Sequence, residues 1–380
     1  MRRTKTVVAA ILCLSAWQWA GCGGPQSGAR NSPSAEKPDE ANVLNFYNWF
    51  DYIAPDTVAA FEKETGIKVR VSYFDTNETL EGRMLTGNSG YDVVVPTAPY
   101  LQRQVRSGAY LPLDKTRLPN LVNMDPAIMA RVAQNDPGNA HAVVYLWGTY
   151  GIVYNEKKLA EVLPGVPPNS WRLIFDPAYA AKLAKCGIST LDAPAGVVRL
   201  VLRYLGREPN EPRPQDLADV EALLAKIRPY IRTIDSSNII ETMANGDSCI
   251  ALGYEGDFFQ ARRRATEAKN GIILGYAIPV EGSLLWFDLL AIPKDAPHAA
   301  NAHRFIDFLM RPPVIANISN FLGYASGNAA AQPLLDPSLL ADTAVYPPPD
   351  QLQRLFVQME DSPDQSRAIT RLWQKFKTGL

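Results

Sequence analysis

The chain of 380 residues lacks several signatures that would point directly to a chemistry. It has no G-x-x-x-x-G-K-[ST] phosphate loop and no G-x-G-x-x-G turn after a strand, so nothing supports an NTPase or a dinucleotide enzyme. Its three histidines, His141, His298 and His303, stand beside no candidate nucleophile, and no cysteine–histidine spacing indicates zinc. We therefore expect no metal and no cofactor. Catalytic triads can be scattered in sequence, so these absences favour a binding protein without excluding an enzyme.

Excess charge of one sign is also lacking. The 38 Lys and Arg residues nearly balance 39 Asp and Glu residues. A formal net charge of −1 gives no indication of a basic surface that would bind nucleic acid. One basic run over 262–269 has no interleaved aromatic residues, and we interpret it as the solvated face of a helix. An apolar content of 47% describes a soluble globular protein, and the length exceeds one ordinary core, so two lobes or domains are predicted.

The N-terminal segment has the layout of an export signal. Basic residues at positions 2, 3 and 5 precede an apolar run over 7–14, which is too short to span a membrane. The predicted signal, residues 1–22, ends in Trp19-Ala20-Gly21-Cys22 and resembles a bacterial lipoprotein box, with Cys22 as the residue that receives lipid. Trp19 replaces the usual aliphatic residue, so a plain soluble export product is the alternative. Residues 23–41 are almost free of apolar side chains and predict a flexible tether on a periplasmic or cell-surface protein.

Cysteines are few. Of the four, Cys13 leaves with the signal and Cys22 is the lipid candidate, so Cys186 and Cys249 remain in the mature fold. In an exported, oxidising compartment this pair is a disulfide candidate, and two separate buried thiols are the alternative.

Strand and helix patterns alternate along the chain. Apolar runs over 43–46, 67–73 and 91–96 predict strands, and each is followed by a helical pattern, the second of them capped by Asn77. This order favours an α/β fold with a parallel sheet covered by helices on both faces. An apolar stretch over 143–154, broken by two glycines, indicates a connection between lobes, and beyond it the alternation starts again.

Carboxylates stand beside aromatic or apolar residues at predicted strand ends, where open α/β sheets bind ligands. Asp51 lies between Trp49 and Tyr52 after the first strand, and a carboxylate framed by aromatic faces suits an organic cation. The alternative for this stretch is a buried Trp and Tyr beside a helix-capping Asp51. Asp288 interrupts an apolar strand and Asp257 follows another, where a carboxylate is costly unless it is paired or lines a cleft.

Several long motifs extend this pattern: NWFDYIAPDTV (48–58), FEKETG (61–66), YDVVVP (91–96), PLDK (112–115), LDAP (191–194), NGD (245–247), ALGYEGD (251–257) and EAKNG (267–271). Together they resemble the polyamine-binding proteins of bacterial ABC importers, nearest to the putrescine-binding branch, from about Leu44 to the end of the chain.

The resemblance implies a two-lobed type II periplasmic-binding-protein fold with the ligand in the cleft between the lobes. The first lobe would comprise 42–146 and about 262–338, and the second about 147–261 and 339–380. It also implies a monomeric, non-enzymatic protein that captures a protonated polyamine of the putrescine or spermidine class and delivers it to a membrane permease.

The resemblance further implies which residues contact the ligand. Trp49 and Tyr52 would pack on its methylene chain, with Asp51 at one end. Cys186 and Cys249 match the positions of a disulfide in the putrescine-binding branch. Further contacts are implied at Thr97, Ser236 or Ser237, Tyr254, Asp257, Trp286, Asp288 and Tyr324.

Some positions depart from the family pattern. Ala195-Gly196 stand where a glutamate usually binds an amine, and Phe50 stands where a small hydroxyl residue is usual. Glu255 replaces a small residue, so it either restores the missing charge or is a solvated residue of the rim, and we favour the rim. These changes leave open which polyamine is bound. Alternatives are a sensor that docks a membrane receptor without transport, a binder of a different organic cation, and an enzyme on the same fold.

Overall fold

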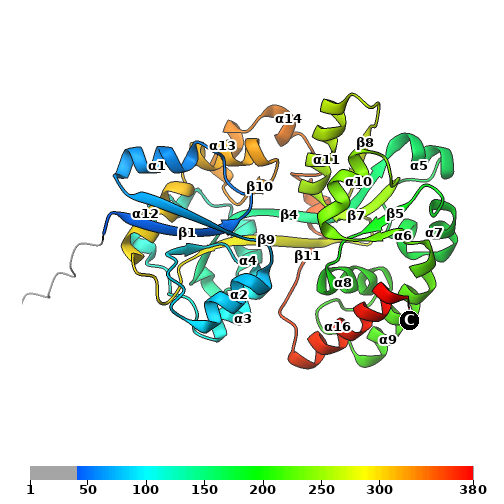
Figure 1. Cartoon of the computed structure of the whole chain (residues 1–380), viewed down its shortest axis with the longest axis horizontal. Coiled ribbons are helices and arrows are strands. Elements are labelled where there is room, and N and C mark those ends of the chain that lie inside the picture. The colour runs from blue at the N-terminus through cyan, green and yellow to red at the C-terminus, as the bar shows by residue number, and fades with distance from the viewer. Residues whose placement is uncertain (1–40, 380) are drawn as a thin grey trace, which may run out of the picture. The chain divides into compact units, whose positions relative to one another are not determined.

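The computed structural model describes residues 41–379, within a compact unit that spans Glu40–Leu380 (Figure 1). The predicted export signal with Cys22, and the tether up to residue 40, lie outside the described residues. None of the helices within 41–379 is both long and apolar enough to cross a membrane. The fold is α/β, as predicted, and its strands follow the order β2-β1-β3-β9-β4-β7-β5-β6.

The first part of the sheet is parallel. β1 (Val43–Trp49) pairs along its whole length with β2 (Lys68–Phe74), and on its other side with β3 (Val93–Val94). β3 is shorter than the strand predicted over 91–96. Pro96 has no N–H with which to extend a ladder. The carboxyl ends of these strands therefore meet at one edge, which is where ligands bind in such sheets.

Two long strands continue from the first part of the sheet into the second. β4 (Ala142–Asn155), predicted as the connection between lobes, runs antiparallel to β9 (Leu284–Ala291) up to the pair Thr149↔Leu285 (Figure 1). Beyond that pair β4 is hydrogen-bonded to two strands of the second part of the sheet, β7 and β8. The second part of the sheet contains β7 (Ile250–Tyr254), β8 (Leu274–Ala277), β5 (Ile188–Thr190) and β6 (Thr233–Ile234).

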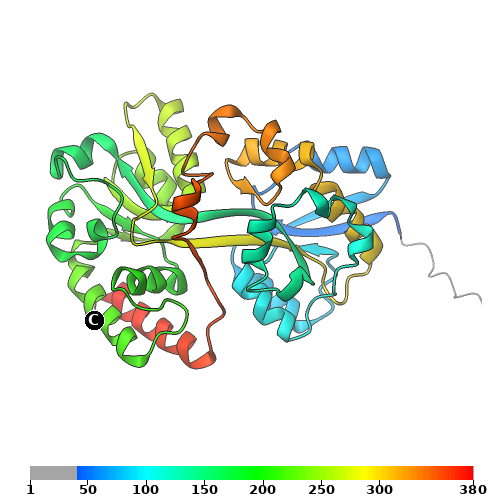
Figure 2. The ribbon, with the colours of Figure 1, turned by 180° about the vertical axis from the view of Figure 1, so that it is seen from behind.

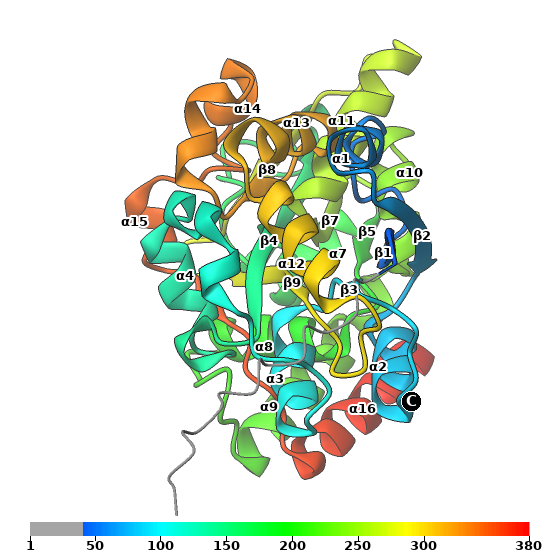
Figure 3. The same ribbon diagram turned by 90° about the vertical axis from the view of Figure 1, so that its left-hand side faces the viewer.

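Helices cover both faces of the first part of the sheet, with α1 and α13 on one side and α2 and α3 on the other (Figures 1 and 3). The N-termini of α1, α2 and α3 follow the ends of strands, as the sequence pattern predicted. The helices of this part are α1 (Thr57–Thr65), α2 (Asn77–Thr86), α3 (Ala98–Arg106), α4 (Pro126–Val132), α12 (Ala299–Leu309), α13 (Pro312–Leu322) and α14 (Pro337–Leu340).

A second group of helices surrounds the other strands. It comprises α5 (Glu156–Val162), α6 (Arg172–Phe175), α7 (Pro177–Leu183), α8 (Pro194–Tyr204), α9 (Pro214–Ile227), α10 (Ile239–Ala244), α11 (Glu255–Ala268) and α16 (Pro363–Thr378). Short 3₁₀ helices connect the elements at Lys115–Arg117, Pro119–Asn123, Pro137–Asn139, Arg228–Tyr230, Ser236–Asn238 and Ala329–Leu334.

The buried apolar side chains form two separate cores, which define the two lobes. The core of the first lobe contains Phe46, Phe61 and Phe305, whose rings meet edge-on at 4.9–5.1 Å. The core of the second lobe contains Trp171 and Trp373. The lobe boundaries near residues 147, 262 and 339 stay a prediction.

The chain returns to the second lobe near its C-terminus. Behind the sheet it passes through α15 (Pro349–Leu352) and β11 (Phe356–Val357), which pairs with β9, and then enters α16 (Figure 2). β10 (Ala325–Ser326) adds to the other side of β4. α16 packs against α8 and α9 and places the end of the chain in the second lobe.

The predicted disulfide is confirmed. Cys186, after α7, is bonded to Cys249, just before β7, and their Cα atoms are 5.4 Å apart. The bond closes a loop of 63 residues within the second lobe.

One predicted helix cap is wrong. Asn77 was expected to cap α2, but the Thr76 hydroxyl accepts the hydrogen bond from the Thr79 N–H at 3.1 Å. Because Thr76 fills the capping position, the Asn77 side chain is available for another contact, described next.

Candidate ligand-binding site

A cavity of about 510 Å³ lies between residues of both cores. Most of the residues predicted to contact the ligand line this cavity, although they lie far apart in the sequence. They are Trp49, Tyr52, Thr97, Ser236, Tyr254, Trp286, Asp288 and Tyr324.

Asp288 is the best supported carboxylate of the cavity wall. It lies on β9 and is 8% exposed, and the Thr97 hydroxyl donates to its Oδ1 at 2.7 Å. Asn77 fixes Thr97 by donating to its hydroxyl at 2.9 Å and by accepting from its N–H at 3.1 Å. Burial raises the pKa of Asp288 to about 6, although the hydrogen bond from Thr97 opposes the rise. Asp288 forms no ion pair with any described residue.

Aromatic rings extend from one lobe to the other. The rings of Tyr52 and Tyr324 meet edge-on at 5.6 Å, and Trp286 contacts Tyr324 at 5.5 Å. Tyr254 lies 6.4 Å from Trp286 and 4.7 Å from Tyr150. Such a wall presents π faces and apolar edges, which suit a cation carried on a methylene chain.

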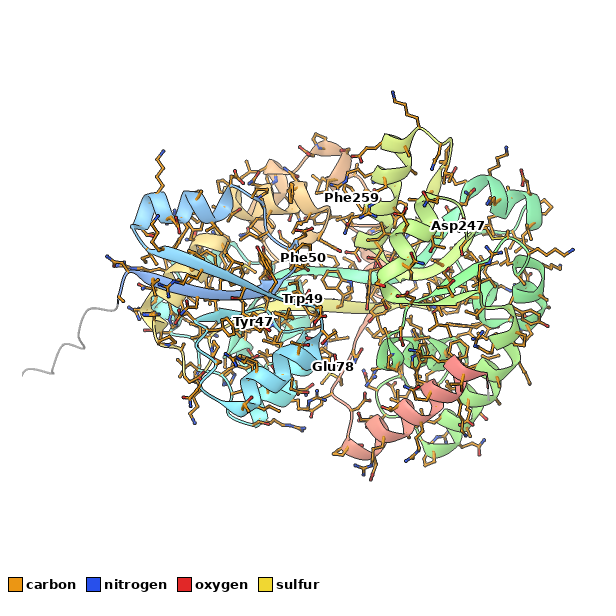
Figure 4. All side chains as sticks on the ribbon, viewed as in Figure 1. Tyr47, Trp49, Phe50, Glu78, Asp247 and Phe259 are labelled. Carbon is orange, nitrogen blue, oxygen red and sulfur yellow. A yellow bond between two sulfur atoms is a disulfide. The ribbon has the colours of Figure 1, made fainter. Side chains whose placement is uncertain are left out.

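Trp49 is held at the end of β1. Its indole N–H donates to the Val95 carbonyl at 3.0 Å, and its ring packs on Phe74 at 4.4 Å. Trp49 and Glu78 lie at the ends of β1 and α2 that point toward the second lobe (Figure 4).

Two glycines allow the tyrosine rings to pack directly on the backbone. A Cβ atom on Gly256 would lie 1.8 Å from the Tyr324 ring, and one on Gly196 would lie 2.7 Å from the Tyr150 hydroxyl. Position 256 is therefore a glycine because the Tyr324 ring occupies the space that a side chain would need. Gly196 belongs to the Ala195-Gly196 pair that stands where the family pattern has a glutamate, and the Tyr150 ring packs on its backbone.

Asp257, at the start of α11, is not among the residues that line the cavity. Its Oδ2 is buried and has no hydrogen-bond partner among the described residues, and burial raises its pKa to about 7. After burial itself, the Asp257 charge is among the causes that raise the pKa of Tyr254 and Tyr324. The carboxylate is therefore close to two residues that line the cavity.

The expectation that Glu255 is a solvated rim residue is wrong. Glu255 is fully buried, and its Oε2 accepts from the Thr149 N–H on β4 at 2.9 Å. It begins α11 directly after β7, so its side chain turns back onto the neighbouring β4, where a Cβ on Gly148 would overlap it. Burial raises the pKa of Glu255 well above its usual range, although the hydrogen bond from the Thr149 N–H opposes the rise.

Two other predicted contacts are not brought to the cavity. Asp51 is exposed, with a left-handed backbone (φ 50°), and does not line it. Ser237 is also exposed and donates its hydroxyl to Asp235 at 2.6 Å. The neighbouring Ser236 does line the cavity.

Several residues that line the cavity were not predicted from the sequence. Tyr150 lies on β4, and Asp192 follows β5 at its carboxyl end, a position that could have marked it as a candidate. Asp75 and Glu78 are exposed at the edge of the cavity, and Glu78 accepts from the Tyr100 hydroxyl.

Within residues 41–379, no group of three or more His, Cys, Asp or Glu side chains could hold a metal ion. The three histidines are outside the cavity lining, and two of them bond structural carboxylates: His141 to Asp136 and His298 to Asp92. The arrangement is suited to holding a cation.

Comparisons with known proteins agree with this geometry. The family described as bacterial extracellular solute-binding protein matches residues 56–347. The putrescine-binding periplasmic protein PotF of Escherichia coli is 46% identical over 342 residues, covering 90% of this chain and 92% of PotF. The putrescine-binding periplasmic protein SpuD of Pseudomonas aeruginosa is 44% identical over 338 residues, covering 89% of this chain and 92% of SpuD.

Solved structures show the same fold. The spermidine/putrescine ABC transporter substrate-binding protein PotD of Streptococcus pneumoniae is 29% identical with a TM-score of 0.77, covering 89% of this chain and 99% of PotD. A putative spermidine/putrescine ABC transporter protein of Listeria monocytogenes is 32% identical with a TM-score of 0.77, again covering 89% of this chain and 99% of its own. The predicted two-lobed fold is thereby confirmed, and the chain belongs to the family of bacterial extracellular solute-binding proteins.

Proposed function

We propose that this protein captures a protonated polyamine of the putrescine class outside the cytoplasm and presents it to an ABC importer. The observation that carries the proposal is Asp288, a buried carboxylate in an aromatic cavity that has no cationic partner among the described residues. An ammonium group taken out of water needs a matched negative charge, and Asp288 supplies one. The putrescine-binding relatives support this ligand class.

In this proposal Asp288 receives one terminal ammonium group. Thr97 and Asn77 hold the carboxylate in place, so little ordering is required when the ligand arrives. The rings of Trp49 and Trp286 cover the methylene chain, at about 0.8 kcal/mol for each buried CH₂ group, and attract the cationic ends.

Asp257 receives the second ammonium group as the lobes close on the ligand. Support comes from its unpartnered buried oxygen and from its proximity to Tyr254 and Tyr324. Closure would bend the connections formed by β4, by β9 and by the segment before α16. Asp51 and Ser237 are left out of this ligand set because they are exposed, and Glu255 because its carboxylate is held by the Thr149 N–H on β4.

The remaining features of the proposed function concern location and partners. The protein acts as a monomer without catalytic activity, and lipid on Cys22 tethers it to the membrane beside its permease. Mass spectrometry of the membrane fraction from a native type of host should show an acylated Cys22. A mature chain that starts elsewhere and is recovered wholly in the soluble fraction would contradict the tether.

Titration calorimetry tests the ligand class. Putrescine, cadaverine, agmatine, spermidine and spermine are titrated into the wild type and into Asp288→Asn and Asp257→Asn. Each substitution should weaken polyamine binding by about 2–5 kcal/mol, because a buried charge pair loses one partner. Asp350→Asn is the matched control, since this carboxylate is 76% exposed and outside the cavity. Absence of saturable binding by every amine, or wild-type affinity in both site variants, would overturn the proposal.

A further inference from the structure

Asp192 is a cavity carboxylate that is already neutralised by the protein. It follows β5 in the second lobe, and its N–H donates to the Ser236 hydroxyl at 2.9 Å. Both of its carboxylate oxygens are occupied by the C-terminal helix. Oδ1 accepts from the Trp373 indole N–H at 2.6 Å, and Oδ2 accepts from the Lys377 ammonium at 2.5 Å.

The other acids near the cavity differ from Asp192, whose side chain is 32% exposed, in this respect. Asp288 and Asp257 form no ion pair with any described residue, whereas Lys377 supplies Asp192 with a full positive charge. Glu255 is held against β4, where its Oε2 accepts from the Thr149 N–H at 2.9 Å. Asp75 and Glu78 are exposed, where solvent weakens their attraction for a cation. Two buried carboxylates therefore remain for a ligand, which matches a diamine.

We propose that Lys377 is a specificity-determining residue that occupies the cation position at Asp192 and so limits the cavity to ligands with two positive charges. The third ammonium group of a linear triamine would have to displace Lys377 or remain without a counter-charge near it. Lys377 thus acts against the triamine by repulsion, while Asp288 and Asp257 attract either ligand. This inference rests on the proposed function.

The alternative role for the pair is to anchor α16. That helix has other anchors, since Leu372, Trp373 and Phe376 are buried in the core of the second lobe. Lys377 is in the last turn of α16 and its side chain is 36% exposed, so its ion pair contributes little to stability. A role in ligand choice and a role in anchoring therefore predict different results.

Lys377→Gln separates the two roles. Calorimetric titration with putrescine and spermidine should show spermidine affinity rising about tenfold, because Asp192 becomes available to a third ammonium group, with putrescine affinity changing less than about twofold. Lys375→Gln is the matched control, because Lys375 is on the same helix but pairs with Glu221, at 2.6 Å, outside the cavity. Lys377→Arg, which keeps the charge, should retain the wild-type preference.

A second variant assigns the gain to Asp192. In Asp192→Asn/Lys377→Gln the liberated carboxylate is absent, and the spermidine gain should disappear. An unchanged spermidine-to-putrescine affinity ratio in a folded Lys377→Gln protein, or a gain that survives the added Asp192→Asn, would overturn the inference. Failure of the wild type to bind any polyamine would instead overturn the proposed function, so the two failures are distinguishable.

Discussion

Acidification should weaken polyamine binding, because the free protein holds protons on its buried carboxylates that a bound ammonium group would displace. Burial raises the pKa of Asp288 to about 6 and that of Asp257 to about 7. Polyamine amines resemble the lysine amine, whose pKa is about 10.4, and stay charged below pH 8. The pH dependence between pH 8 and pH 6 therefore reports on the protein.

The size of the effect follows from the two pKa values. Both carboxylates are ionised in about 0.9 of the free protein at pH 8 and in about 0.05 of it at pH 6. Putrescine affinity should therefore fall about 20-fold over this range, and binding should release about 1.4 protons at pH 6 but about 0.1 at pH 8.

Calorimetry in buffers of different ionisation enthalpy measures both quantities. In Asp257→Asn only Asp288 titrates, so the fall between pH 8 and pH 6 should shrink to about twofold. An affinity that stays constant from pH 8 to pH 6, or that increases on acidification, would refute the assignment of these carboxylates to the ligand.

Three further results are expected. In the free protein the raised pKa values of Asp288 and Asp257 stabilise the fold fully below pH 3.8, and this contribution is lost as the pH rises through about 6 and 7. Putrescine should therefore raise the melting temperature more at pH 8 than at pH 6. Equal shifts at the two pH values would contradict this. Trp286→Ala should weaken putrescine binding by about 1–3 kcal/mol through lost apolar and cation–π contact, as measured by calorimetry, and unchanged affinity would place the ligand elsewhere. Replacing Cys186 and Cys249 by serine should lower the free energy of unfolding by about 2–4 kcal/mol in denaturant titrations while leaving putrescine affinity intact, and unchanged stability would deny the disulfide a structural role.

Residues at strand ends were predictable from the sequence because strand ends in an α/β sheet meet at one edge. Trp49 ends an apolar strand, Tyr52 and Thr97 follow strands, and Asp288 interrupts one. Their pattern and the family resemblance indicated a shared site, and all four line the cavity.

The direction of individual side chains was less predictable. Asp51 was expected to face the ligand, but its left-handed backbone leaves it exposed. Glu255 was expected at the rim, but its position at the start of α11 turns it onto β4. Such orientations depend on the local backbone and on the neighbouring strand, which residue spacing does not encode.

Apart from the Cys186–Cys249 disulfide, the hydrogen bonds between distant segments were not predicted from the sequence. Asp192 and Lys377 are 185 residues apart, and they meet because the chain returns to the second lobe as α16. Asn77 supports Thr97 across 20 residues because Thr76 fills the helix cap. Both contacts depend on tertiary packing.

A crystal structure of the protein with putrescine at neutral pH tests the central claim most directly. We predict one terminal ammonium group within hydrogen-bond distance of Asp288, with the methylene chain between the rings of Trp49 and Trp286. Putrescine bound outside this cavity, or bound inside it with no contact to Asp288, would contradict the claim.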